Sequence, residues 1–314
     1  MYKYVLKRIF AMIFIVLGVL LVVQFIMYIT PNDITPLILG SEWTPEAAAE
    51  LRHELGIDQP LLVQYGRYIL NLLQGDFGTS PLTGTPIIEQ LKVRLPNTVI
   101  LMLGGVFITV AFALPIGVQT AVKPNSVGSV FSTIFGLFGS SMPAFWLGLL
   151  LILLFSVKLG WLPAGGTDQG IKSLIMPWIT LGLMSLAQTM RTTRSSMLES
   201  IRMDYIRTAK AKGVKHRDVI YKHALKNAMM PIITVVGNQV GILLGGAIIT
   251  ETVFAIPGMG RLMIEGMQNR DIPSTQGAIF SMAVCIAIVS LVIDLLYAYV
   301  DPRIKAQYTS GRRE

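Results

Sequence analysis

Blocks of about 20 mostly apolar residues constrain this chain more than any other feature. A hydrocarbon core about 30 Å thick needs about 20 helical residues to cross it. Of 314 residues, 53% are hydrophobic and only 14% are charged, against roughly 25% charged in an ordinary soluble domain. Six blocks are long enough to span, approximately at residues 9–29, 99–122, 127–157, 174–190, 231–250 and 277–300. We therefore predict an all-α polytopic membrane protein with six transmembrane helices.

Basic residues are distributed unevenly between the two sides that these spans define. Six spans put both termini on one side, and that side holds 18 of the 26 Lys and Arg residues. An excess of basic residues marks the cytosolic side of a membrane protein. Both termini are therefore expected in the cytosol. The same placement accounts for the net charge of +8 without nucleic acid as a partner.

The outside loop between the first two spans carries repeated helix start and stop signals. Thr44-Pro45-Glu46 favours an N-cap followed by a first-turn proline, and Gly56 is a suitable stop. Apolar residues then recur at helical spacing over 61–73, and a third helix from Thr85-Pro86 is expected to end at Pro96. Short helices that pack on the outer membrane surface are the favoured interpretation. Contact with a docked partner is the alternative.

The sequence lacks the motifs of a catalytic or metal site. It contains no GxxxxGK[ST] motif, hence no Walker-type ATP site, and no GxSxG or HExxH motif that would support a hydrolase. His53, His216 and His223 do not have the spacing of a metal pair on one helix face, and Cys285 is the single cysteine. We therefore predict no catalytic residue, no metal and no cofactor.

Few strongly polar side chains interrupt the spans. Gln24 is the only one in the first span, and Asp294 is the clearest ionisable residue inside a span. Asp294 lies about 9 Å from the cytosolic end of its helix. A structural partner such as a cytosolic arginine is its favoured role, with a proton or ion relay as the alternative. An ion-driven carrier is expected to show midplane charges and inverted repeats, and neither is found in the sequence.

Small residues and prolines mark the other spans. Glycines recur every four residues in the fifth span, at Gly237, Gly241 and Gly245. They form one helix face on which another backbone can approach closely. Packing within this chain is favoured, and a second membrane subunit or a pathway are the alternatives. Prolines interrupt spans two, three and four and would free backbone carbonyls there, at Pro115, Pro143 and Pro177.

The cytosolic segment between spans four and five, residues 191–230, holds ten basic residues and is too short for an enzyme domain. Ala209 and Ala211 favour a first helix, and Gly213 provides a left-handed stop. A second helical stretch is expected at about 215–226. Two short helices joined at a glycine would form a rigid contact for a partner. The alternative is that the basic residues only hold the loop inside and touch anionic lipid.

Distinctive motifs are spread over nearly the whole chain. They are GDFGTS at 75–80, SMPAFWLG at 141–148, MRTTRSSMLE at 190–199, DYIRTAKAKG at 204–213, HALKNAMMPIIT at 223–234, ITETVFAIPGMGRL at 249–262, NRDIP at 269–273 and DLLYAYVDPR at 294–303. Together they resemble the membrane permeases of binding-protein-dependent ABC importers, in the dipeptide, oligopeptide and nickel branch. Arg207 and Thr208 stand where the general importer pattern has Glu and Ala, and Lys226 replaces the usual loop-ending proline. A sequence with these departures resembles the peptide branch of the family.

This resemblance implies the fold, the domains and the partners. The implied fold is that of a type I ABC importer permease, with short extracytoplasmic helices between spans one and two and cytosolic coupling helices between spans four and five. Expected domains are 1–30 with the first span, the outside loop 31–98, the permease core 99–303 with its coupling loop 191–230, and the cytosolic tail 304–314. Expected partners are a homologous second permease, two cytosolic ABC ATPases, an extracytoplasmic substrate-binding protein and the lipid bilayer.

The resemblance also implies a function, an ATP-driven importer of dipeptides or oligopeptides in a bacterial inner or plasma membrane. Closing of the ATPases is expected to move the 204–226 helices and to tilt the spans from inward-open to outward-open. A nickel or metal-chelate importer is the alternative within the family. An ATP-independent channel, an ion-coupled carrier and a scaffold are the alternatives outside it.

Three groups of site residues are expected. Those that couple the chain to an ATPase are Asp204, Tyr205, Arg207, Thr208, Ala209, Ala211, Gly213, His223 and Asn227. Those in helix packing or a pathway are Pro143, Gly237, Gly241, Gly245 and Asp294. Those at an extracytoplasmic gate or partner contact are Pro257, Gly258, Gly260, Arg270 and Asp271.

Overall fold

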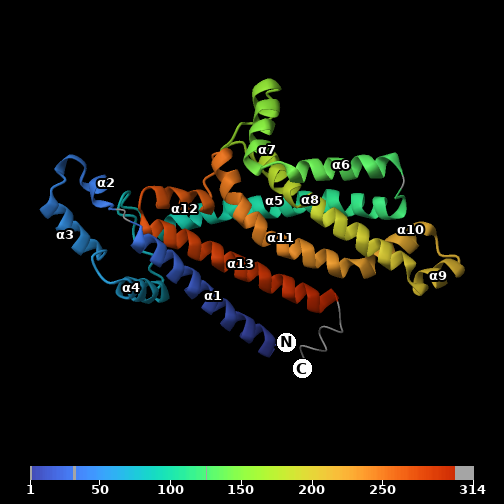
Figure 1. The fold of residues 1–314 in the computed structure, drawn as a ribbon, viewed down its shortest axis with the longest axis horizontal. Helices are drawn as coiled ribbons and strands as arrows, with labels where there is room; N and C mark the ends of the chain where they lie inside the picture. Colours follow the sequence, from blue (N-terminus) through green and yellow to red (C-terminus); the bar gives the residue numbers. More distant parts are fainter. Residues whose placement is uncertain (1, 31–32, 125, 301–314) are drawn as a thin grey trace. The chain divides into compact units, whose positions relative to one another are not determined.

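The computed structural model describes residues 2–30, 33–124 and 126–300, and the regular secondary structure of these residues is helical apart from an isolated bridge between Thr79 and Pro86 (Figure 1). Among these residues, five helices are long and apolar enough to cross a membrane, namely Leu6–Ile29, Ile87–Val122, Ile171–Arg202, His216–Val253 and Ile272–Leu295. The chain is therefore an all-helical polytopic membrane protein. The predicted cytosolic tail, 304–314, lies outside the described residues.

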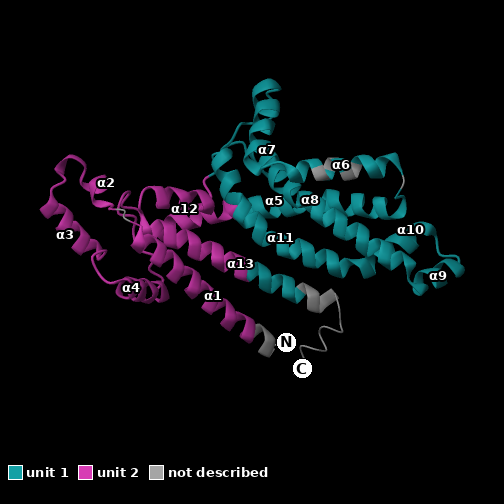
Figure 2. Ribbon diagram, viewed as in Figure 1, with its two compact units in different colours: residues 1–4, 99–256, 288–314 teal, residues 5–98, 257–287 magenta. Residues whose placement is uncertain are grey.

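Two compact units divide the chain (Figure 2). Unit 1 comprises residues 1–4, 99–256 and 288–314, and unit 2 comprises residues 5–98 and 257–287. Two long helices, α5 (Ile87–Val122) and α13 (Ile272–Val300), contribute residues to both units.

The predicted third span, residues 127–157, is not one helix. α6 (Val127–Ser141) ends before Pro143, and α7 (Ala144–Leu151) follows it and passes into the π-helix η2 (Ile152–Lys158). Pro143 has a ψ of 136°, and the residue before it is also extended, because a proline ring disfavours helical backbone at the preceding position. The apolar stretch Ala144–Lys158 that remains is shorter than an ordinary span.

Unit 1 is built around α8 (Ile171–Arg202) and α11 (Leu225–Val253), which pack along each other. Apolar side chains of both helices, such as Leu181 and Leu243, share one buried cluster. Within this contact, Thr189 Oγ1 donates a hydrogen bond to Gln239 Oε1 at 3.0 Å, and Gln239 Nε2 donates to the Ser185 carbonyl at 3.3 Å. A buried polar clasp therefore joins the two helices in addition to apolar packing.

The loop that precedes α8 is fastened to the end of α11. The Gly166 amide donates to the Phe254 carbonyl at 2.8 Å. A Cβ on Gly165 would lie 2.2 Å from the same carbonyl oxygen, which is a direct clash with backbone. Only glycine therefore fits at position 165 without moving the chain.

The segment of unit 1 that is predicted to be cytosolic contains α9 (Asp204–Ala211), α10 (His216–Asp218) and the π-helix η3 (Val219–Ala224). The second helical stretch, predicted at about 215–226, begins near residue 215 as predicted. It does not end at Lys226, because η3 continues directly into α11. The prediction that the fifth span begins after Pro231 is wrong, since Pro231 lies inside α11. The proline removes one backbone bond to the carbonyl of Asn227, and a cavity lined by both residues leaves that carbonyl space for hydration.

Unit 2 contains most of the helices that are predicted to lie outside the membrane. They are α2 (Thr35–Leu39), the 3₁₀-helix η1 (Gly40–Glu42), α3 (Pro45–Leu55), α4 (Leu61–Leu73) and α12 (Met259–Gln268), together with most of α1 (Tyr2–Ile29). The predicted caps of α3 are confirmed, because the Thr44 side chain accepts from the Ala47 amide at 3.1 Å and Gly56 has a φ of +67°. The predicted extent of α4 is also confirmed.

The prediction that Pro96 ends the third outside helix is wrong. That helix is the first part of α5, which runs through Pro96 without a break. Pro96 and Lys92 both lie on the exposed side of α5. The Lys92 carbonyl, which loses its backbone partner at the proline, can therefore be hydrated, and the helix continues.

Candidate coupling and gating sites

The first helix of the predicted coupling segment, α9, packs on the rest of unit 1 by its apolar face. Ile206 and Ala209 are buried in a cluster with Val118 of α5, Met197 of α8 and Val219 of η3. The opposite face of α9 is exposed. The helix is thus fixed on one side to three other elements and presents the other side outward.

Gly213 ends α9 in the predicted left-handed conformation, with a φ of +78°. The Gly213 amide donates to the Lys210 carbonyl at 3.0 Å, and the Val214 amide donates to the Ala209 carbonyl at 3.2 Å. This pair of bonds is a Schellman motif, and Val214 packs against the same apolar cluster as Ala209. The prediction of a left-handed stop at this glycine is confirmed.

The structure separates the predicted coupling residues by exposure. Those that are exposed are Asp204, Tyr205, Arg207, Thr208, Ala211, Gly213, His223 and Asn227. Ala209 is buried, so it packs α9 and has no surface for a partner. Asn227 Nδ2 donates to the His223 carbonyl at 2.7 Å, across the junction where η3 continues into α11.

Two ion pairs lie on the exposed surface of α9, α10 and η3. Arg207 lies 3.7 Å from Asp204, and Lys222 lies 3.1 Å from Asp218. Exposed pairs of this kind contribute little to stability. A cavity of about 290 Å³ adjoins this surface, between α8, α9 and α11, and Glu199 and Tyr205 line it. The sequence did not point to Glu199 as part of a site.

The three glycines of the α11 repeat have different surroundings. A Cβ on Gly237 would lie 2.8 Å from Ile293 of α13, so this glycine packs within the chain. Gly241 and Gly245 have no atom within 4 Å of such a Cβ, and both are exposed. Asp294 follows the Ile293 contact and is buried. The structure therefore brings Asp294 near Gly237, whereas Gly241 and Gly245 lie on an open helix face.

The outer motifs at 75–80 and 269–273 meet in unit 2 around Asp271. The carboxylate of Asp271, 5% exposed, accepts hydrogen bonds from the Ser80 hydroxyl, from the Ser274 hydroxyl at 2.7 Å and from the Ser274 amide at 3.1 Å. Asp271 therefore caps the start of α13 and fastens the loop of Ser80 to it. Arg270 has a φ of +62° and donates to the Asp33 carbonyl.

The remaining predicted gate residues lie at the start of α12, next to α5. Asn97 Nδ2 donates to the Pro257 carbonyl at 2.8 Å, and the Met259 amide donates to Thr98 Oγ1 at 2.8 Å. Gly258 precedes the first turn of α12, and Gly260 is buried within it. These bonds hold α12 against α5 inside unit 2.

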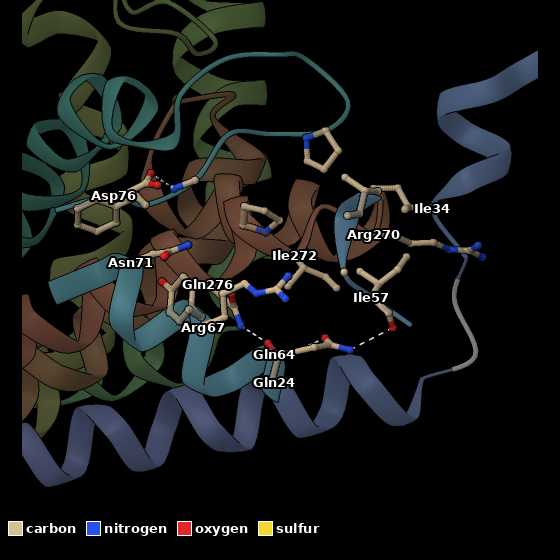
Figure 3. A pocket seen from close by; sticks show the side chains of 17 residues that line it. Gln24, Ile34, Ile57, Gln64, Arg67, Asn71, Asp76, Arg270, Ile272 and Gln276 are labelled. Carbon is tan, nitrogen blue, oxygen red and sulfur yellow. Dashed lines mark hydrogen bonds between the residues drawn. The ribbon is translucent and has the colours of Figure 1, made fainter. Parts of the chain in front are cut away.

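A cavity in unit 2 was not anticipated from the sequence; several polar side chains line it, although most of its surface is apolar (Figure 3). It has a volume of about 190 Å³. Three glutamines from α1, α4 and α13 form a chain beside it, in which Gln276 donates to Gln24, and Gln24 Nε2 donates to Gln64 Oε1 at 2.8 Å. Only Gln24 carried a signal in the sequence, as the single strongly polar residue of its span.

The outer loop also contains a perturbed carboxyl group. Burial raises the pKa of Asp33, but hydrogen bonds from the Arg52 guanidinium and from Thr35 outweigh it and hold that pKa below its ordinary value. In the part of the chain that the structure describes, no cluster of three His, Cys, Asp or Glu side chains has the form of a metal site.

Two family descriptions match the chain. "Binding-protein-dependent transport system inner membrane component" matches residues 113–306, and the corresponding N-terminal membrane component matches residues 1–102. Among named relatives, the dipeptide transport system permease protein DppB of Alkalihalophilus pseudofirmus is 41% identical and covers 97% of this chain and 100% of its own length. The glutathione transport system permease protein GsiC of Salmonella paratyphi A is 41% identical, covering 97% of this chain and 99% of its own length.

A third relative and a solved structure extend this similarity. The oligopeptide transport system permease protein AppB of Bacillus subtilis is 36% identical and covers 97% of this chain and 100% of its own length. An inward-facing structure of the MetNI methionine ABC transporter aligns with a TM-score of 0.58 and 16% identity, covering 68% of this chain and 98% of that one. At this identity the alignment shows a shared fold.

Proposed function

Because the chain belongs to the family of binding-protein-dependent transport system inner membrane components, we propose that it is one of two homologous permease subunits of an ATP-driven peptide importer. The relatives are named for dipeptide, oligopeptide and glutathione transport, and glutathione is itself a small peptide. Two separate cytosolic ATPases supply the energy, and an extracytoplasmic binding protein delivers the peptide. Both termini lie in the cytosol of a bacterial cell.

In this proposal, α7 and η2 together form the remaining span of the six-span type I fold. Their apolar stretch, Ala144–Lys158, is short for a span. Phe145, Leu149 and Leu153 on it are exposed, as expected of side chains that face lipid or another subunit. A short span is accommodated by local thinning of the bilayer or by association with a partner.

The observation that carries the coupling role is the two-sided character of α9. Its inner face, with Ile206 and Ala209, is fixed to α5, α8 and η3. Its outer face carries Tyr205, Arg207 and Thr208 in exposed positions. A force applied to the outer face by an ATPase would therefore reach α8 and α11 as one packed body rather than bend a loose loop.

The other predicted residues take roles by their position. Ala209 and Gly213 shape α9 and its end, while the exposed Asp204, Ala211, His223 and Asn227 border the ATPase contact. Gly241 and Gly245 lie on an exposed face of α11 that includes Asn238 and Thr234, and we assign this face to the second permease subunit or to the peptide pathway. Pro257, Gly258, Gly260, Arg270 and Asp271 hold the outer gate.

Transport by the reconstituted complex tests the proposal. Proteoliposomes that contain both permeases and both ATPases should take up a labelled dipeptide only with ATP and the binding protein, and this chain alone should take up none. Arg207→Glu should lower uptake and stimulated ATP hydrolysis together by at least about tenfold, or about 1.4 kcal/mol. Lys123→Glu makes the same charge change at an exposed cytosolic residue outside the coupling segment and should leave both rates unchanged.

Two results would overturn the coupling role and the transport role separately. If Arg207→Glu assembles with its partners and retains both rates, α9 is not the ATPase contact. If dipeptide enters vesicles that contain only this chain at the rate of the full complex, the chain is a channel or carrier in its own right.

A further inference from the structure

The outside helix α4 turns its apolar side away from the rest of unit 2. Leu62, Leu70 and Leu73 are 72%, 61% and 79% exposed. On the opposite side of the helix, Gln64 lines the cavity of unit 2 (Figure 3). Tyr68 lines it as well. An amphipathic helix in water buries its apolar stripe and exposes its polar side. α4 is arranged in the reverse sense, as expected of a helix whose surroundings are apolar.

Two hydrogen bonds set the level of α4 along the membrane-spanning helix α1. The Tyr65 hydroxyl donates to the Leu17 carbonyl at 2.9 Å, and Gln64 accepts from Gln24 at 2.8 Å. Counted back from Ile29, where α1 ends, Leu17 lies about 18 Å and Gln24 about 8 Å along the helix. The hydrocarbon core is about 30 Å thick. Gln24 therefore lies in the outer half of the core and Leu17 close to its midplane, so the first turn of α4 lies beside the core and not above it.

The exposed surface of α1 within unit 2 is also apolar. Phe14, Val22 and Phe25, which flank the level of α4, are all largely exposed. This surface belongs to a helix of the length and composition that cross a membrane. The apolar side of α4 therefore continues a surface that already requires a hydrocarbon environment.

The single charge of α4 is compatible with that environment. The Arg67 guanidinium donates to Gln59 Oε1 at 2.8 Å and lines the cavity of unit 2. At 100° per residue it lies about 140° from Leu62 and about 120° from Leu73 but only about 60° from Leu70, so it borders the apolar side of α4. A charged group at this level is tolerated when it reaches polar partners in a cavity instead of lipid.

We infer that α4 is embedded in the outer leaflet, with Leu62, Leu70 and Leu73 in contact with lipid acyl chains and with its polar side turned to the glutamine-lined cavity. The outside loop then contributes to the membrane-embedded part of the protein, in addition to the spans. This inference concerns the placement of α4 and does not depend on which solute is transported.

Nitroxide labels on the assembled complex in liposomes test this placement. Single cysteines at positions 62, 70 and 73 are introduced in a Cys285→Ala background, since Cys285 is the chain's only cysteine. Collision with oxygen, which concentrates in lipid, is compared with collision with a water-soluble nickel chelate. All three labels should favour oxygen, as should Phe14→Cys on α1, whereas Glu50→Cys on the exposed side of α3 should favour the nickel chelate.

A second measurement uses the unsubstituted complex and so does not depend on variants that fold. Lipids with a photoactivatable diazirine near the end of the acyl chain should label peptide 61–73 and leave peptide 45–55 of α3 unlabelled. Labels at 62, 70 and 73 that favour the nickel chelate would place α4 in water and overturn the inference. Labels that neither reagent reaches, with no lipid adduct on 61–73, would show that a protein partner covers the helix and would overturn it as well.

Discussion

Replacing Gly213 by alanine isolates the cost of the left-handed turn that ends α9. A Cβ at this position would have no atom within 4 Å, so alanine causes no clash. The cost comes from the backbone alone, because φ is +78° and an L-residue in this region loses about 1–2 kcal/mol. That free energy corresponds to a roughly 5- to 30-fold rise in the open population of the turn.

Hydrogen exchange of the complex measures this opening directly. The Val214 amide, which donates to the Ala209 carbonyl, should exchange faster by that factor in Gly213→Ala, while amides of α8 stay unchanged. Gly213→Asn should have a smaller effect, since asparagine tolerates the left-handed region, and Gly213→Val a larger one. Transport-coupled ATP hydrolysis should fall in the same order, Asn, Ala, Val.

Gly18→Ala is the matched control, because Gly18 is a helical glycine of α1 with the same open space and no positive φ. It should leave exchange at Val214 unchanged. The reasoning fails if Gly213→Val exchanges at Val214 like the wild type. It also fails if the three variants show no order, because the cost would then not be set by φ.

Three further outcomes are expected. Asp271→Ala removes a helix cap and a buried acceptor for Ser80, so the free energy of unfolding should fall by about 2–4 kcal/mol, seen as a lower Tm of the complex, whereas an unchanged Tm would contradict the buried network. The lowered pKa of Asp33 stabilises the fold above about pH 4, and this contribution is lost as the pH falls through that pKa. Pepsin cleavage near Arg52 should therefore rise below about pH 4, and in Asp33→Asn it should already be high at pH 5. A double-mutant cycle between Thr189 of α8 and Gln239 of α11 should give a coupling free energy of about 0.6 kcal/mol. Zero coupling would show that apolar packing alone joins α8 and α11.

Local signals in the sequence predicted the parts of the fold that local chemistry determines. Gly56 and Gly213 end helices where their left-handed backbone was expected, and the family identified from the motifs is confirmed. Proline was the least reliable signal. Pro96 and Pro231 lie inside helices, because the carbonyl that each leaves unpaired has access to hydration. The prediction that Pro115 and Pro177 interrupt their spans is also wrong, since α5 and α8 continue through them, whereas Pro143 does break its predicted span.

Contacts between distant segments could not be predicted in the same way. The sequence marked Gln24 as unusual but did not indicate that Gln64 and Gln276, far apart in the chain, would bond to it. The burial of Ala209 depends on η3, which folds back only after the turn at Gly213. The side that α4 turns outward is set by its hydrogen bonds to α1. Hydropathy along the sequence does not predict such a bond.

The contact between Gly165 and the Phe254 carbonyl limits how this protein can diversify. Any side chain at position 165 meets main-chain atoms that cannot be exchanged by mutation, so no single compensating substitution restores the fit. Gly160 and Gly170, at the two ends of this loop, leave open space around an added methyl group but have φ values of +64° and +57°. Substitution at the two ends should therefore cost backbone strain alone, as at Gly213, whereas at Gly165 it also meets main-chain atoms.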